Sequence, residues 1–347
     1  CGSDGAPAAD GGAAGSSAGG SPAASAGSSP GSSAGGASGS TGSPATGAAG
    51  ASTGTKLPTA NLYGSFTLRL VPPTEATGTS PAVAAQTNFI GFVSEGATPM
   101  PNRWVEDQKA GGCTLYTPKA PFCDPACGSS AMCVSDNQCV KNPTPKGVGT
   151  ITLKGLSSGG DVTMTPVGAN NNYQPKAGTT LPYPPCAEGA ALSLAVSGGE
   201  YQSFELKARC IQPLEFNGSL KLVKGMAAKL EWTAPGDKQL ARLNVRLDIS
   251  HHGGSRGKIE CDVEDTGSLE LPSAMVTRLL ELGVAGYPTV ILTRIVSGGT
   301  GSGEPQNVQF AVRESVERSV EIEGLLSCTE DSDCPTPKTC QSDLTCK

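Results

Sequence analysis

The chain has 347 residues and a formal net charge of -6 at pH 7, with its lysines and arginines scattered along it. Because there is no basic block, nucleic acid is not an expected partner. Charged residues and Pro288 interrupt the most apolar stretch, so no run of residues reaches transmembrane length.

The first part of the chain is a low-complexity segment. From Gly2 to Thr55 it consists almost entirely of Gly, Ala, Ser, Thr and Pro. No large apolar side chain is present there to offset the entropy cost of ordering the backbone. Residues 1–56 are therefore predicted to form a disordered tether.

Cys1 precedes Gly2, Ser3 and this flexible segment. The terminus resembles that of a bacterial lipoprotein whose leader peptide has been removed. In that family the cysteine thiol carries diacylglycerol, and a glycine after the cysteine favours the outer membrane. The resemblance implies lipidation of Cys1, a membrane partner held through that lipid, and an outer membrane lipoprotein of the bacterial cell envelope, periplasmic or surface-exposed. The alternative is a chain boundary that falls on a cysteine.

Two strand-like runs follow the tether, in residues 57–112. They extend from Leu62 to Val71 and from Thr87 to Glu95, and a loop rich in Pro, Thr and Gly joins them. We expect both to join a sandwich formed later in the chain, as edge strands.

Twelve further cysteines, an even number, indicate disulfides and an oxidising compartment. Four of them lie between Phe122 and Val140, and another four lie near the end of the chain. These segments have too few apolar side chains to build a core, so disulfides, each contributing about 2 to 4 kcal/mol, must hold their loops. Residues 113–142 and 328–347 are therefore predicted to be cysteine-rich modules.

The C-x5-C-x5-C pattern of the two modules resembles short extracellular disulfide repeats in which alternate cysteines pair. Sequence alone leaves the connectivity open. Zinc is the rival interpretation, but zinc knuckles need C-x2-C pairs, and neither module has such a pair or a histidine. The resemblance implies four disulfides: Cys123 with Cys133, Cys127 with Cys139, Cys328 with Cys340, and Cys334 with Cys346.

Residues 147–326 are predicted to form the sandwich. Gly147 to Leu156 and Asp161 to Val167 indicate one hairpin around a Gly-rich turn. Ala190 to Val196 and Tyr201 to Ala208 indicate a second hairpin.

The second hairpin also predicts a disulfide. An antiparallel register centred on its turn brings Cys186 nearly opposite Cys210, so these two should bond. Elimination then leaves Cys113 and Cys261, which either bridge the first cysteine module to the sandwich or remain free buried thiols.

The stretch from Lys229 to Ser297 has the most regular alternation of apolar and polar residues. Its apolar side chains recur at every second position, as in half-buried strands: Leu243, Val245, Leu247 and Ile249, then Ile259, Cys261 and Val263, then Val290 and Leu292. Asn307 to Val312 and Val316 to Ile322 are two further strand-like runs. We predict a mainly β fold, an antiparallel β-sandwich with one apolar interior.

One short helix is expected within this stretch. Pro272 suits a first helical turn, Met275, Leu279 and Leu282 share one face, and Gly283 ends the helix.

Trp232 lies in the segment LEWTAPG, which resembles the second strand of fibronectin type III and related immunoglobulin-like domains. In that family the tryptophan packs in the core. Leu230 lies on the same face, so the resemblance implies a core residue, although the tyrosine that the family places on the next strand is absent. An exposed, sugar-binding ring is the alternative.

Asp265 opens the segment DTGS, which resembles the active-site signature of aspartic peptidases. In that family two such aspartates share a proton and activate water. This chain lacks a second loop of that kind, and an Asp-Thr-Gly tight turn explains the same residues. Asp265 is therefore only a weak catalytic candidate.

Asp248, His251 and His252 form a weak candidate metal site, because the only two histidines of the chain lie together in a Gly-rich loop. Exposed turn residues are the favoured alternative, since a metal site needs three or four converging ligands. Two acidic clusters could bind calcium, but neither has the required Asp-x-Asp-x-Asp-Gly loop, so solvated turns are favoured. These clusters are Asp262, Glu264 and Asp265, and Glu330, Asp331 and Asp333.

No nucleophile-histidine-acid triad or phosphate-binding loop can be built from these residues. We therefore expect a surface lipoprotein that needs no cofactor and acts as a non-enzymatic binding or structural module, with a protein or glycan ligand. The alternatives are a hydrolase at Asp265 or at His251 and His252, and a carbohydrate-binding sandwich. The sequence leaves the oligomeric state open.

Overall fold

The computed structural model describes residues 62–76, 81–216, 218–254, 256–300, 305 and 307–347, all of which belong to one compact unit. The predicted tether and Cys1 lie outside the described residues. Within these ranges, no helix combines the length and apolar character needed to cross a membrane.

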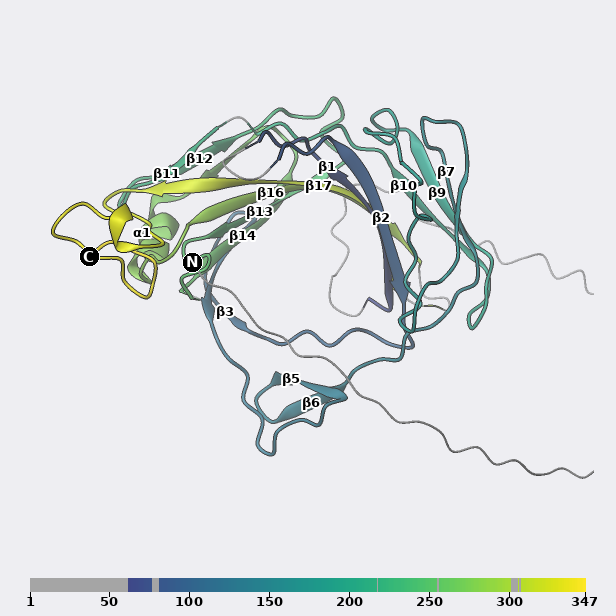
Figure 1. Cartoon of the computed structure of the whole chain (residues 1–347), viewed down its shortest axis with the longest axis horizontal. Helices are drawn as coiled ribbons and strands as arrows, with labels where there is room; N and C mark the ends of the chain where they lie inside the picture. The colour runs from purple at the N-terminus through teal and green to yellow at the C-terminus, as the bar shows by residue number, and fades with distance from the viewer. Residues whose placement is uncertain (1–61, 77–80, 217, 255, 301–304, 306) are drawn as a thin grey trace, which may run out of the picture. The chain divides into compact units, whose positions relative to one another are not determined.

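The largest element is a nine-stranded sheet (Figure 1). Its strands run in the order β2-β1-β17-β16-β13-β14-β4-β3, and β11 pairs with the far end of β17. The prediction of a mainly β fold is confirmed. The bounds are β1 (Gly64–Val71), β2 (Gln86–Val93), β3 (Trp104–Ala110), β4 (Cys113–Pro118), β11 (Leu220–Leu222), β13 (Arg242–Asp248), β14 (Lys258–Glu264), β16 (Thr289–Gly299) and β17 (Val308–Ile322).

β17 is a single strand of 15 residues and pairs with β16 along the length of the latter. The prediction of two separate strands here is wrong. Arg313 and Glu314 interrupt the apolar alternation in the sequence, yet the backbone stays extended through both. Glu314 faces inward and is fully buried.

Two pairs in this sheet are parallel, β1 with β17 and β11 with β17. The sheet is therefore mixed, where the sequence indicated antiparallel pairing throughout. β1 lies between β2 and β17, so only β2 is the edge strand that we expected. A parallel pair needs a long crossover, and here most of the chain lies between its two members.

A four-stranded sheet with the order β10-β9-β7-β8 confirms both predicted hairpins. It packs against β16 and β17. At the contact, a Cβ atom on Gly298 would lie 2.0 Å from the carbonyl oxygen of Lys207, so glycine is required for this approach. The bounds are β7 (Ile151–Lys154), β8 (Val162–Met164), β9 (Ala191–Val196) and β10 (Phe204–Arg209).

The buried apolar side chains form two clusters rather than the one interior expected. Strands β16 and β17 are long enough to contribute to both. The first core lies between the large and the four-stranded sheet and includes Phe66, Leu68, Ile151, Leu194, Val296 and Phe310. The second core lies under β13, β14 and the helix and includes Leu243, Val245, Trp232, Met275, Leu292 and Val316.

The second core is covered by the predicted helix, α1 (Ser273–Glu281), and by the strand pair β12 (Ala228–Glu231) and β15 (Ser268–Leu271). Met275, Val276 and Leu279 are the buried residues of the helix, and Pro272 is its N-cap. Gly283 follows the helix with a φ of 91°, a backbone conformation that glycine adopts readily.

Six disulfides join the described cysteines, and each joins two cysteines that the sequence analysis paired: Cys113–Cys261, Cys123–Cys133, Cys127–Cys139, Cys186–Cys210, Cys328–Cys340 and Cys334–Cys346. Cys113 belongs to β4, where it lies directly opposite Cys261 of β14. The compact cysteine-rich module therefore follows β4 instead of beginning at residue 113, and its hairpin consists of β5 (Ala131–Ser135) and β6 (Gln138–Lys141).

Candidate functional site

Arg294 is the central residue of a polar cluster between the two cores. It faces inward on β16 and is 1% exposed. Its Nε and one Nη donate to Asp265, and its other bonds go to the carbonyl oxygens of Gln212, Pro213 and Thr233. A guanidinium has five N–H donors, so all of them are used.

Asp265 is fully buried and bonded on both carboxylate oxygens. Its Oδ2 accepts from Arg294 Nε at 2.5 Å, and its Oδ1 accepts from Trp232 Nε1 at 2.6 Å. A carboxylate engaged in this way cannot reach a substrate or activate water. This placement contradicts the catalytic hypothesis for Asp265, and it confirms that Trp232 is a core residue.

Glu314 completes this polar seam, which we define as Arg294, Asp265, Trp232, Glu314 and Tyr183. Glu314 accepts from the backbone N–H of Leu214 at 2.6 Å and from the Tyr183 hydroxyl at 3.1 Å. Burial raises the pKa of Glu314 above its usual range, against the opposing effect of these bonds and of Arg294. Burial also raises the pKa of Tyr183, with Glu314 adding to the effect. Arg294, Asp265, Trp232 and Glu314 are buried, and Tyr183 is half-buried at the end of the seam.

Asp248, His251 and His252 do not converge on a common point. The oxygens of Asp248 accept from the backbone and hydroxyl of Ser250 and from Arg246. The two imidazole rings lie 4.0 Å apart between centroids, and His252 is exposed with a φ of 65°. These three residues are not among the groups of described side chains with at least three ligand atoms close enough for one ion.

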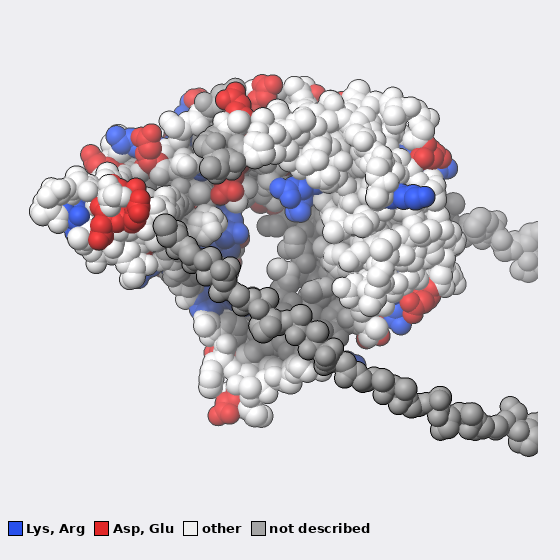
Figure 2. Space-filling model, viewed as in Figure 1, with Lys and Arg blue, Asp and Glu red and all other residues white. Residues whose placement is uncertain are grey.

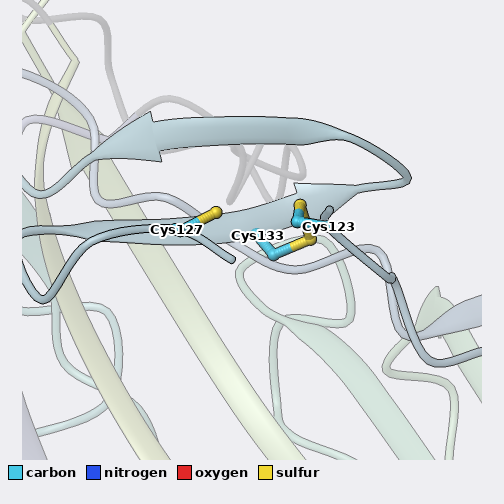
Figure 3. A group of neighbouring side chains, drawn as sticks. All are labelled: Cys123, Cys127 and Cys133. Atoms are coloured by element: carbon cyan, nitrogen blue, oxygen red, sulfur yellow. A yellow bond between two sulfur atoms is a disulfide. The ribbon is translucent and has the colours of Figure 1, made fainter. Parts of the chain in front are cut away.

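The groups that do meet that distance condition consist of cysteines. Figure 3 shows one of them, in which Cys123 and Cys133 are joined and Cys127 lies beside them. Cys127 is itself bonded to Cys139. Because disulfide sulfurs are not thiolates, these groups do not offer metal ligands.

The two acidic clusters are explained by local bonds. Asp262 accepts from Arg242 at 2.9 Å, and Asp265 lies in the seam. Asp333 accepts from the backbone of Thr329 and Glu330. Asp331 accepts from the backbone N–H of Cys340. Asp262 therefore joins two strands, Asp265 is buried rather than in a solvated turn, and Asp331 and Asp333 stabilise a turn of the C-terminal module.

A second candidate site lies on the face of the large sheet that points away from both cores. In Figure 1 this sheet curves from β2 over β17 and β16 towards β3, with the four-stranded sheet and α1 on the outside of the curve. We call its inner side the concave face. Its side chains alternate with those of the cores along each strand, and they include Thr67, Arg69, Arg313, Ser315, Thr293, Arg242, Asn244, Arg246, Glu260, Thr114 and Tyr116.

A hollow of about 310 Å³ lies on this face over β4, β14, β13 and β16. Amide, hydroxyl and charged side chains line it, among them Asn244, Thr114, Thr293, Arg246 and Glu260. Asn244 makes no side-chain hydrogen bond to any residue that the structure describes. The hollow therefore offers polar groups that the fold itself does not use.

One rim of the concave face is aromatic and cationic. Lys258 is 8% exposed, and its Nζ lies 4.3 Å from the centroid of the Trp104 ring and 5.5 Å from that of Tyr116. The same Nζ lies 2.5 Å from a carboxylate oxygen of Glu260, which lines the hollow. These contacts fix the side chains at the edge of the hollow.

Arg69 and Arg313 lie on the same face, directly opposite each other on β1 and β17. Figure 2 shows Lys and Arg side chains on the wall of the opening under the large sheet. Sequence reasoning missed the hollow and this arginine pair. The arginine pair depends on the parallel register of β1 with β17, for which a single sequence gives no signal. The hollow depends instead on how β4, β14, β13 and β16 pair.

No protein-family model and no curated protein matches the chain. Nine chains of solved structures do match it. One is the crystal structure of the chicken CNTN1 FN1-FN3 domains, with 10% sequence identity and a TM-score of 0.20, covering 71% of this chain and 84% of that chain.

Proposed function

We propose that the chain is a non-enzymatic binding module that holds a hydrophilic ligand, a glycan, on its concave face. The observation that carries this proposal is the hollow of about 310 Å³ lined by Asn244, Thr114 and Thr293. Hydroxyl and amide groups at the floor of a concavity are the usual means of fixing the orientation of a small polar ligand.

The position of the hollow favours a glycan over a peptide strand. Peptides that bind sheets commonly add to an exposed strand edge. The hollow lies over β4, β14, β13 and β16, each of which is paired on both sides. The outer edge of the sheet, β3, carries the charged residues Glu106, Asp107 and Lys109, which discourage strand addition.

The test is a glycan screen with the full chain carrying Cys1→Ser, which removes the lipid acceptor. For any glycan bound by this protein, Asn244→Ala is expected to weaken the affinity about fivefold, the value of one lost hydrogen bond. Gln202→Ala, at an exposed position beyond β9, is the matched control and should bind normally. The proposal fails if no glycan binds, or if Asn244→Ala binds as tightly as its parent.

We further propose that lipid on Cys1 attaches this module to the outer membrane. The resemblance of Cys1, Gly2 and Ser3 to lipoprotein termini supports the attachment, and the disulfides fit an oxidising compartment. Cys1→Ser should move the protein from the membrane fraction to the soluble fraction. Retention of the variant in the membrane fraction would contradict lipid attachment at Cys1.

A further inference from the structure

The fold holds two arginines side by side on the concave face. Arg69 of β1 and Arg313 of β17 are register partners, and both are exposed. Backbones of paired strands lie about 4.8 Å apart, and like charges directly opposite each other destabilise a sheet. Stability of the sheet therefore gives no reason for two arginines at these opposite positions.

No acidic residue occupies a neighbouring position on this face. Neither guanidinium makes an ion pair or hydrogen bond with any described residue. The pKa of Arg313 is lowered, because the surrounding strands remove part of its hydration and because Arg69 repels its charge. The same-face neighbours across and along the strands are Asn88, Thr67, Val71, Ile295, Ala311 and Ser315.

Four other arginines in and beside the large sheet have acidic partners, whereas Arg318 of β17 donates to the carbonyl oxygen of Glu317. Arg242 bonds Asp262, Arg246 bonds Asp248, Arg278 bonds Asp107, and Arg294 bonds Asp265. Arg69 and Arg313 differ from these four arginines, because the N–H donors of their guanidinium groups bond no residue that the structure describes. Such forks match the geometry of carboxylate and sulfate groups.

The pair is continuous with the hollow. Ser315 follows Arg313 on the same face of β17, and its Oγ lies 2.9 Å from Oγ1 of Thr293. Thr293 lines the hollow. A chain lying in the hollow therefore reaches the arginines after crossing one row of hydroxyl groups.

We propose that Arg69 and Arg313 together bind an anionic group, a carboxylate or sulfate, of the glycan held on the concave face. This inference rests on the proposed glycan-binding function and narrows the ligand to an acidic glycan. The negative net charge of the whole chain does not oppose it, because attraction at a contact depends on the local charge.

Three probes separate the sources of the charge: a uronate oligosaccharide, a sulfated oligosaccharide, and a neutral oligosaccharide of equal length. Each is titrated calorimetrically into the full Cys1→Ser chain. Binding of at least one acidic probe is expected to exceed that of the neutral probe at least tenfold and to weaken with added salt. Arg69→Gln and Arg313→Gln should each lower this affinity about tenfold.

Arg209→Gln is the matched control, because Arg209 is exposed on the four-stranded sheet and the charge change is the same. It should bind normally. The melting temperatures of Arg69→Gln and Arg313→Gln without ligand should equal or exceed that of the parent, which a structural role would not allow.

Equal binding of acidic probes by the parent and by the Arg69→Gln/Arg313→Gln double variant overturns the arginine site, as does an absence of acidic binding. Binding of the neutral probe that depends on Asn244 would in either case leave the proposed glycan-binding function standing.

Discussion

Arg294 and Arg313 lie on neighbouring strands, one row apart, on opposite faces of the same sheet. Arg294 is buried, and its five donors bond Asp265 and three backbone carbonyls. Arg313 is exposed, and its nearest charged register partner is another arginine, Arg69. The first guanidinium bonds within the fold, whereas the second bonds no residue that the structure describes.

The difference between the two arginines is one between a buried and an exposed charge on the same sheet. A buried charge persists only where its hydrogen bonds are complete, because an unpaired ion in the interior costs several kcal/mol. Arg313 loses only part of its hydration, so this cost is smaller there. The contrast shows why the resemblance of DTGS to a catalytic motif was misleading: Asp265 lies on the buried side.

The contrast between buried Arg294 and exposed Arg313 predicts its largest effect on stability at Arg294. Arg294→Met leaves Asp265 buried without its cation, and about 3 to 5 kcal/mol of unfolding free energy should be lost. The measurement is chemical denaturation with the disulfides intact. Arg313→Met should change the same quantity by about 0.5 kcal/mol or less. Equal losses of unfolding free energy in Arg294→Met and Arg313→Met would contradict the proposed difference between the buried and the exposed face of the sheet.

Trp232 offers a smaller change within the seam. Trp232→Phe keeps an aromatic ring in the second core but removes the donor at 2.6 Å from Asp265 Oδ1. About 1 to 3 kcal/mol should be lost, the cost of leaving a buried acceptor unsatisfied. Asp265→Asn in the same background should show a coupling energy in a double-mutant cycle. Strict additivity of the two changes would mean that this hydrogen bond has no energetic role.

Glu314 gives the seam a pH dependence. Its pKa in the folded protein is raised above the ordinary glutamate value of 4.5, chiefly by burial. The folded state therefore binds the proton more tightly, and this stabilisation is complete below pH 4.5 and is lost as the pH rises through the raised pKa. Glu314→Gln should flatten the dependence of unfolding free energy on pH above 4.5. An unchanged profile in the variant would show that Glu314 is not its source.

The smallest effect is expected on the concave face. Arg69→Gln removes a like charge opposite Arg313 and should raise the unfolding free energy without ligand by about 0.2 to 1 kcal/mol. High salt should shrink this gain, because it screens the repulsion between exposed charges. A loss of stability in Arg69→Gln would instead assign Arg69 a structural contact.

Local features of the fold could be predicted from sequence. The two hairpins, the helix after Pro272 and the core position of Trp232 each follow from spacing or resemblance within a short segment. The bond between Cys186 and Cys210 follows from the register of one hairpin. In these cases the residues that determine the structure are close together in the chain.

Apart from the bond between Cys113 and Cys261, which follows by elimination, the features that depend on distant partners could not be predicted. The sequence pattern predicts two strands in place of β17, because the inward Glu314 breaks the apolar alternation. Its partners Leu214 and Tyr183 are far away in sequence. The parallel pairing of β1 with β17 joins the two ends of the folded region. The pair of Arg69 and Arg313 depends on that pairing, and the hollow depends on the side-by-side placement of β4, β14, β13 and β16.

The most direct test of the account is a crystal structure of the full Cys1→Ser chain with the acidic oligosaccharide that binds it best. The account predicts that the sugar lies on the concave face, with its hydroxyls near Asn244 and an anionic group between Arg69 and Arg313. An oligosaccharide bound on the four-stranded sheet or at a cysteine-rich module, with the concave face empty, would contradict it.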